Sequence, residues 1–391
     1  MLTDAERRQH IYLIGRTGTG KSTLLYNLMR SDFARGRGFA LIDPHGDLAL
    51  ALATATPSER INDTIYFDPL DTHVVVHNPI ITVPPLHRGT IAAHIVSSFK
   101  HIWAESWGPR LEYILTNAVR LLLENTGASL TDIPRLLIDA PYRTQLLTRC
   151  ADPYIKAFWT IEYAGYGDRL RAEAIAPIQN KVGHFANNPI LRAVLEGRST
   201  IDIPGIMNTR KVLLCNLSKS MGAEPSHLLG ALLVTAFAQA AEARAVLPEE
   251  ERPDFTLYVD EFQNYATTTF ASILSEARKY RLNLVLANQF MDQVPEMLRH
   301  SVIGNAGTIA AFRIGAFDAP ILSRELGISE RELIDLPNRT ARVKTMNGDH
   351  PTEAMRISTL PPLSASDNFA TVQGHTRSRY ARPRDNNNTG G

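Results

Sequence analysis

Cysteine is scarce in this sequence, and long apolar runs are missing. Its 391 residues include two cysteines, Cys150 and Cys215, with no Cys-x-x-Cys pair, which excludes a disulfide framework or cysteine zinc site and favours a reducing compartment. No stretch approaches the roughly 20 apolar residues that span a bilayer. The nearest, 228–240, contains Thr235 and Gln239 and is predicted to be a buried helix. The polar start, MLTDAERRQH, excludes a secretion signal. We therefore predict a cytoplasmic protein with no integral membrane segment.

Charge of one sign is also missing. The chain has 41 Lys and Arg against 40 Asp and Glu, a net charge of +1, with 44% hydrophobic and 7% aromatic residues. This composition is typical of a folded globular protein and excludes a disordered or fibrous one. The usual sign of a nucleic-acid binder is a clearly basic domain, so the overall charge does not by itself predict such a partner.

Short apolar runs alternate with helical segments in two parts of the chain, which predicts an α/β fold with a parallel sheet covered on both faces. The predicted strands are 10–14, 39–42, 64–67, 211–217, 255–259, 282–287 and 308–312. Between the two parts the sequence is helical, with predicted helices that include 111–124, 132–138 and 172–185. We predict an α/β core in two parts, 1–88 and 201–363, an all-helical insertion, 89–200, and a polar, disordered tail, 364–391.

The strongest motif is GRTGTGKS, which follows a predicted strand and opens a predicted helix. It matches the phosphate-binding pattern G-x-x-x-x-G-K-[ST], in which glycines let backbone amides close round phosphates at a helix N-terminus. Lys21 is then expected to neutralise the β- and γ-phosphates and Ser22 to bind Mg²⁺. The alternative is a glycine-rich turn without a ligand. The predicted nucleotide-binding residues are Gly15, Thr17, Gly18, Thr19, Gly20, Lys21, Ser22 and Thr23.

Two acids end another predicted strand, in FTLYVDEFQN. A carboxylate at that position can hold the magnesium opposite Ser22, and a second can polarise the attacking water. We predict Asp260 as the metal ligand and Glu261 as the catalytic base. Alone, the pair reads equally well as a solvated strand end.

Further polar residues end other strands. Parallel strands place their carboxyl ends at one sheet edge, so Gln289 is expected beside Gly15 and Asp260, within reach of the γ-phosphate or the water. Asp43 and His45 end the second strand at the same edge, although a purely structural turn is equally consistent with Asp-Pro-His-Gly. Gln289, too, has the alternative role of satisfying turn amides.

A basic helix, SEARKYR, precedes the strand that leads to Gln289. Four ionisable groups on a helix most often form a solvated face. An arginine there is also suited to act on a neighbouring subunit's γ-phosphate. The spacing does not select among Arg278, Lys279 and Arg281.

Taken in order, these motifs resemble those of a known family. LIGRTGTGKSTLL, ALIDPHGDL, FDPLD, ESWGPRLEYIL, NKVGHF, KVLLCNLSKSMG, LYVDEFQNYAT, LSEARKYRLNLVLANQF and GNAGT are similar to the conjugative coupling proteins of the TraG/TraD type in type IV secretion systems. These belong to the HerA/FtsK superfamily of hexameric DNA-pumping ATPases. The resemblance covers roughly residues 8 to 360.

The resemblance implies a RecA-like P-loop NTPase core with an inserted helical domain, ATP and Mg²⁺ as cofactors, and a ring of six subunits around DNA. Lys21 and Ser22 fall on Walker A, Asp260 and Glu261 on Walker B, and Gln289 on the polar sensor. Arg278 falls on the arginine of the family's RKY helix. The insertion is expected to contact relaxosome proteins, secretion components or DNA.

Many coupling proteins begin with transmembrane helices, and this sequence starts shortly before its first predicted strand. We expect a soluble relative, a protein held at the inner membrane through partners, or a shortened chain. Other candidate functions are a HerA-like motor for DNA-end processing, phage defence or genome packaging, and a nucleotide-binding scaffold that pumps nothing. In a ring, basic groups are needed only along the channel, for which Arg16 and Lys219 are candidates, so the neutral charge permits DNA as a partner.

Overall fold

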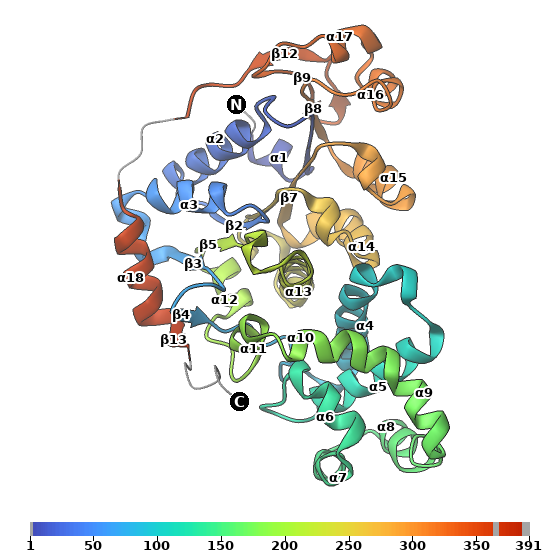
Figure 1. Cartoon of the computed structure of the whole chain (residues 1–391). Coiled ribbons are helices and arrows are strands. Elements are labelled where there is room, and N and C mark those ends of the chain that lie inside the picture. Colours follow the sequence, from blue (N-terminus) through green and yellow to red (C-terminus); the bar gives the residue numbers. More distant parts are fainter. Residues whose placement is uncertain (1–2, 363–366, 385–391) are drawn as a thin grey trace. The chain divides into compact units, whose positions relative to one another are not determined.

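The computed structural model describes residues 3–362 and 367–384 and divides into two compact units. The core unit comprises Met1–Phe67, Asp202–Ser220 and Ala236–Arg379. The helical unit comprises Asp68–Ile201, Met221–Thr235 and Tyr380–Gly391. The helical unit therefore takes in segments on both sides of the predicted insertion, 89–200, and each unit is described separately below (Figure 1).

Within the described residues, the core unit is built on a nine-stranded sheet with the order β12-β9-β8-β1-β7-β6-β2-β5-β3. The strands from β8 to β3 are parallel, and β9 and β12 are antiparallel additions at one edge. The bounds are β1 Ile11–Ile14, β2 Gly38–Asp43, β3 Thr64–Phe67, β5 Val212–Asn216, β6 Phe255–Val259, β7 Leu282–Asn288, β8 Thr308–Ala311, β9 Thr340–Lys344 and β12 Met355–Ser358.

The central strands are buried along their whole length, as their mostly apolar sequences predict. Helices α2, Lys21–Ala34, and α3, Asp47–Thr54, pack on one face of the sheet and share a core with β1, β2 and β7. On the other face, Phe262 stacks against Phe270 of α14, Thr268–Glu276, and meets Tyr12 of β1 edge-on. The sheet is therefore covered on both faces, so its functional groups have to lie at the ends of its strands.

Other helices of the core unit are α1 Asp4–Arg7, α12 Ile203–Asn208, α15 Glu296–Asn305, α16 Ala319–Leu326 and α17 Glu330–Ile334. Helix α13, Ala223–Glu242, contributes residues to both units. With the turn after it, α13 is long and apolar enough to cross a membrane, but 67% of its most apolar stretch is buried within the protein. Burial is what the sequence predicted for residues 228–240.

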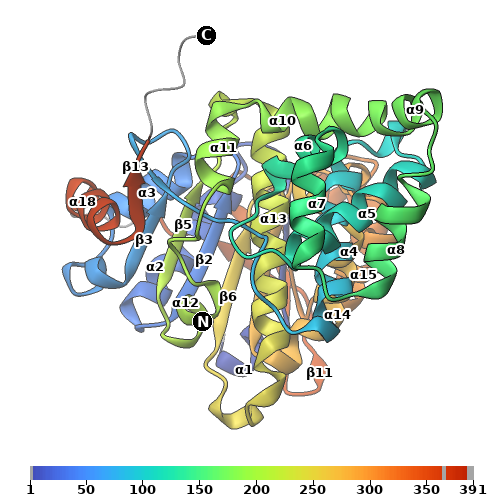
Figure 2. The same cartoon turned by 90° about the horizontal axis from the view of Figure 1, so that it is seen from below.

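Residues 89–200, all of which the structure describes, form only helices and turns. Several of these helices begin with proline at their first position, which suits the fixed φ of that residue. Figure 2 shows α4 to α9 gathered together. The helical unit also contains a small sheet of β4, His73–Val75, and β13, Ala381–Pro383. The helix bounds are α4 Pro85–Ile102, α5 Pro109–Leu123, α6 Ile133–Ile138, α7 Ala140–Thr148, α8 Pro153–Ala157, α9 Asp168–Ile178, α10 His184–Ala186 and α11 Pro189–Leu195.

The prediction of a disordered tail over 364–391 is wrong for residues 367–384. Helix α18, Phe369–Tyr380, lies beside α3 and the edge strand β3 (Figures 1 and 2). The backbone N–H of Tyr66 donates to Thr376 Oγ1 at 3.0 Å, and the ring of Phe369 meets that of Tyr66 edge-on. Val372 is fully buried. A few well-spaced residues thus order a polar helix, while 364–366 and 385–391 lie outside the described residues.

Candidate nucleotide-binding site

The glycine-rich loop connects β1 to α2, with Gly20 directly before the helix. Gly18 and Gly20 have φ of +76° and +118°, which side chains rarely tolerate. A Cβ on Gly15 would lie 2.6 Å from Phe312 Cβ, and one on Gly20 would lie 3.1 Å from Arg339 Cα. The loop therefore lies against Phe312, just after β8, and Arg339, just before β9, and the structure requires glycine at positions 15 and 20.

Lys21 is the first residue of α2, and its side chain turns back into the loop. Its Nζ donates to the carbonyl oxygen of Gly15 and, at 3.4 Å, to that of Arg16. The side chain is 6% exposed, and burial lowers the pKa of Lys21, while the carboxylates of Glu261 and Asp260 act against this shift. A buried cation thus faces two buried acids across the loop.

The remaining loop residues divide between buried and exposed positions. Thr19 is buried, and its Oγ1 donates to Arg16 O at 2.6 Å, which closes the loop on itself. Thr17 and Ser22 are exposed, and Thr23 is half-buried in the first turn of α2. Ser22 is therefore accessible to a ligand in the place where the sequence predicted a magnesium ligand.

Asp260 and Glu261 directly follow β6 and are 5% and 7% exposed. Burial raises the pKa of Asp260 to about 7, helped by the nearby charges of Glu261 and Asp43 and opposed by Lys21. Glu261 has a φ of +47°, a left-handed conformation that costs a non-glycine residue about 1 kcal/mol or more. A strained backbone and clustered buried charge are typical of functional sites.

A chain of side-chain hydrogen bonds connects the loop to the acids. Thr17 Oγ1 donates to Gln289 Oε1 at 2.9 Å, and Gln289 Nε2 donates to Glu261 Oε1 at 2.7 Å. Gln263 Nε2 donates to the other carboxylate oxygen, Glu261 Oε2, also at 2.7 Å. The structure therefore brings Lys21, Asp260, Glu261 and Gln289 together, as the strand-end argument predicted.

Gln263 was not identified from the sequence. The available signal was an amide two residues after the second acid in DEFQ, but its reach depends on the tight turn Phe262–Tyr265. Register explains the rest of the convergence. Ile14 of β1 is paired with Asn288 of β7, and Val259 of β6 with Leu286, so the three strands end together.

Asp43 ends β2 at the same edge, but both of its carboxylate oxygens serve the turn into α3. They accept hydrogen bonds from the backbone N–H groups of His45 and Ala49, each at 2.9 Å. Asp43 is buried and His45 is exposed. Of the two alternatives for this motif, the structure shows the turn, and Asp43 affects the site through its charge.

Arg278 lies near the amino-terminal ends of the strands, opposite the ends that carry the glycine-rich loop. It is exposed in the turn Ala277–Tyr280 before β7, whereas Gln289 follows the far end of that strand. Lys279 pairs with Glu276 at 2.5 Å and Arg281 with Glu249 at 3.1 Å. Arg278 forms no ion pair within the described part of the chain, so it is the arginine of this group left available to another molecule.

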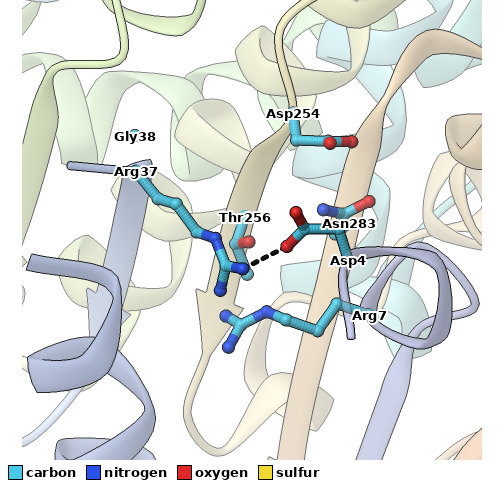
Figure 3. Close-up of a pocket in the computed structure, with 7 residues that line it drawn as sticks. All are labelled: Asp4, Arg7, Arg37, Gly38, Asp254, Thr256 and Asn283. Atoms are coloured by element: carbon cyan, nitrogen blue, oxygen red, sulfur yellow. Dashed lines mark hydrogen bonds and ion pairs between the residues drawn. The ribbon is translucent and has the colours of Figure 1, made fainter. Parts of the chain in front are cut away.

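A small hollow of about 10 Å³ also opens at the amino-terminal edge of the sheet (Figure 3). The hollow is lined by the Arg37–Asp4 ion pair and by the neighbouring Arg7, which donates to Asp32 at 2.6 Å. The space is large enough for one water molecule at most. It is part of a structural charge network and is separate from the glycine-rich loop. Its lining residues are Asp4, Arg7, Arg37, Gly38, Asp254, Thr256 and Asn283.

Over part of its length, this chain is similar to a known protein family. Residues 2–158 match the family model described as the type IV secretion-system coupling protein DNA-binding domain. The resemblance to the coupling proteins is confirmed. No curated protein matches the sequence.

Solved structures of coupling proteins share the fold of this chain. The conjugative coupling protein TrwB, in its TrwBdeltaN70 form, superposes with a TM-score of 0.70 at 16% identity, covering 93% of this chain and 87% of that one. TrwB in complex with ADP and Mg²⁺ gives 0.69 at 18% identity, covering 95% and 89%. VirB4 of Thermoanaerobacter pseudethanolicus gives 0.55 at 13%, covering 90% of each. The predicted α/β class with a mostly parallel sheet and helical insertion is thereby confirmed.

Proposed function

We propose that this coupling-protein relative hydrolyses ATP and uses the energy to move DNA. The observation that carries the proposal is the hydrogen-bonded chain from Thr17 through Gln289 to Glu261, beside the buried Lys21 and Asp260. A glycine loop alone supports nucleotide binding. Next to the loop, Glu261 has a strained backbone and accepts hydrogen bonds from Gln289 and Gln263. A glutamate placed in this way supports hydrolysis, because nucleotide binding does not need a base.

The residues fit ATP with Mg²⁺. Gly15, Gly18 and Gly20 leave part of the loop backbone without side chains at the N-terminus of the 14-residue helix α2, where backbone N–H groups are suited to phosphate oxygens. Within the described residues, no cluster of three His, Cys, Asp or Glu side chains is able to hold a metal ion. Mg²⁺ shared between phosphates and a few protein oxygens fits such a site.

Each predicted residue then has one task. Lys21 balances phosphate charge. Ser22 and Asp260 would hold Mg²⁺, which would supply further neutralisation of the phosphate charge. Glu261 accepts a proton from the attacking water, and Gln289 senses the phosphate side of the site.

A role as a DNA motor also requires an assembly and partner molecules. The match to a coupling-protein DNA-binding domain supports DNA as the substrate that is moved. The position of Arg278, far from the loop of its own chain and without an ion pair among the described residues, supports action on a neighbouring subunit. We propose a cytoplasmic homo-hexamer that works in conjugative transfer, with relaxosome or secretion proteins as partners.

The first test is ATP hydrolysis with and without DNA. We expect DNA to stimulate hydrolysis, Lys21→Ala to abolish it and Glu261→Gln to slow it at least about 100-fold. Exposed residues provide matched controls, Lys156→Ala and Glu296→Gln, which should keep the parent rate. Full activity in both site variants contradicts the catalytic assignment, and hydrolysis that DNA does not change contradicts the motor.

The second test addresses assembly. If Arg278 acts across a subunit boundary, each variant lacks a different half of the site. Arg278→Ala still has the glycine-rich loop, and Lys21→Ala still has the arginine, so a boundary between the two variants can combine an intact loop with an intact arginine. Mixing the two inactive proteins should then restore part of the activity at mixed boundaries. Absence of restoration, together with specific activity that does not depend on protein concentration, contradicts the ring.

A further inference from the structure

Among the residues that the structure describes, the side chain of Gln263 hydrogen-bonds only to Glu261. Its Nε2 donates to Glu261 Oε2 at 2.7 Å. Its Oε1 is buried and accepts no hydrogen bond from the described residues. The orientation of the amide is set by this contact, because the reversed amide would place an acceptor against a carboxylate. Nothing else among the described side chains holds the amide in place by hydrogen bonding.

The turn that carries Gln263 is packed between aromatic rings. Phe262 and Tyr265, the first and last residues of the turn, are fully buried. The ring of Phe262 stacks on that of Phe270 with centroids 5.8 Å apart and meets that of Tyr12 edge-on at 6.2 Å. Aromatic packing on both sides thus fixes the backbone from which Gln263 reaches the carboxylate.

The other hydrogen bond to Glu261 comes from Gln289 and is of a different kind. Gln289 donates to Glu261 Oε1, but its own Oε1 accepts from Thr17, an exposed residue of the glycine-rich loop. Any ligand that rearranges Thr17 therefore acts on Gln289 directly. Within the described part of the chain, Gln263 has no side-chain hydrogen bond to the loop, so its hydrogen bond to Glu261 does not depend on the loop.

We propose that Gln263 is a positioning residue for hydrolysis. It anchors Glu261 Oε2, so that the carboxylate keeps its place when Gln289 changes partners on the phosphate side. Oε1 is then the atom released to accept the water proton. This inference rests on the proposed ATPase function and adds to it a residue that neither motif spacing nor family resemblance assigns.

The test uses the full-length protein and Gln263→Met, which keeps the length of the side chain and removes the donor. We expect kcat to fall by about 10- to 100-fold, the range that misplacement of a catalytic group produces. The KM for ATP and the affinity for a fluorescent non-hydrolysable ATP analogue should stay within about twofold, because Gln263 does not touch the loop. The exposed Gln145→Met provides the matched control and should behave as the parent.

A double-mutant cycle separates positioning from general structural support. In a Glu261→Gln background the base is gone, so adding Gln263→Met should lower single-turnover hydrolysis no further. An unchanged kcat in Gln263→Met, an equal loss in both backgrounds, or weakened analogue binding would each overturn the proposal. If Glu261→Gln itself hydrolyses ATP at the parent rate, the proposed base fails as well. If instead Glu261→Gln is slow and Gln263→Met keeps the parent rate, the proposed base stands and only the positioning role of Gln263 fails.

Discussion

A buried charge network fixes the N-terminal helix to the core unit, and its removal gives a quantitative prediction. Arg7 of α1 pairs with Asp32 of α2 at 2.6 Å, with exposed fractions of 5% and 0%. Tyr258 of β6 donates to the same Asp32 oxygen at 2.6 Å, and Arg37 pairs with the other oxygen at 3.2 Å. Asp32 thus joins the helix after the glycine loop to the strand before Asp260.

Asp32→Asn keeps the shape and removes the charge, leaving Arg7 buried without a counter-ion. Breaking a buried pair in this way costs about 3 to 5 kcal/mol, because the remaining charge is desolvated and uncompensated. The exposed pair of Arg331 and Asp335, at 92% and 64% exposure, provides the control. Asp335→Asn should change the free energy of unfolding by no more than about 0.5 kcal/mol.

The assay exploits the distribution of tryptophan. The three tryptophans, Trp103, Trp107 and Trp159, all belong to the helical unit, so their fluorescence follows that unit, whereas far-UV circular dichroism follows both. In urea, Asp32→Asn should move the dichroism transition to lower concentration by more than it moves the fluorescence transition. A loss of less than about 1 kcal/mol, or equal shifts with both probes, would refute the reasoning.

Three further predictions follow from single positions. Gly20→Ala should abolish binding of an ATP analogue and lower the melting temperature, because φ is +118° and the new Cβ meets Arg339 at 3.1 Å; normal binding would show that the loop relaxes. Burial lowers the pKa of His77 to about 4, against about 6.5 when unfolded. The free energy of unfolding should thus fall by up to about 3 kcal/mol between pH 6.5 and 4, where only the unfolded chain takes up this proton, and His77→Gln should reduce that slope in urea titrations. Val372→Asp should detach α18, seen as faster amide exchange in residues 369–380; unchanged protection would contradict its anchoring role.

The sequence predicted the parts of the fold that depend on local burial. Strands such as β1 and β6 are mostly apolar and buried, and the glycine loop is recognisable because it lies between such a strand and a helix. Convergence of Lys21, Asp260 and Gln289 followed from a general property of parallel sheets. These predictions needed no knowledge of which strands are neighbours.

Features that depend on distant partners were not predictable. β12 is short and largely exposed, and it forms a strand by pairing with β9. α18 is ordered by contacts with Tyr66, about 300 positions earlier in the chain. Gln263 reaches Glu261 because the backbone of Glu261 is left-handed, and no residue type in the motif announces that conformation.

The most direct test of the central claim separates binding from turnover in one variant. Glu261→Gln keeps the loop, Lys21 and Asp260, so it should bind a fluorescent ATP analogue with the parent affinity and yet hydrolyse ATP at least about 100-fold more slowly, with or without DNA. Lys21→Ala, measured beside it, should lose binding. Parent-like hydrolysis by Glu261→Gln would contradict the claim that these converging strand ends form a hydrolytic nucleotide site.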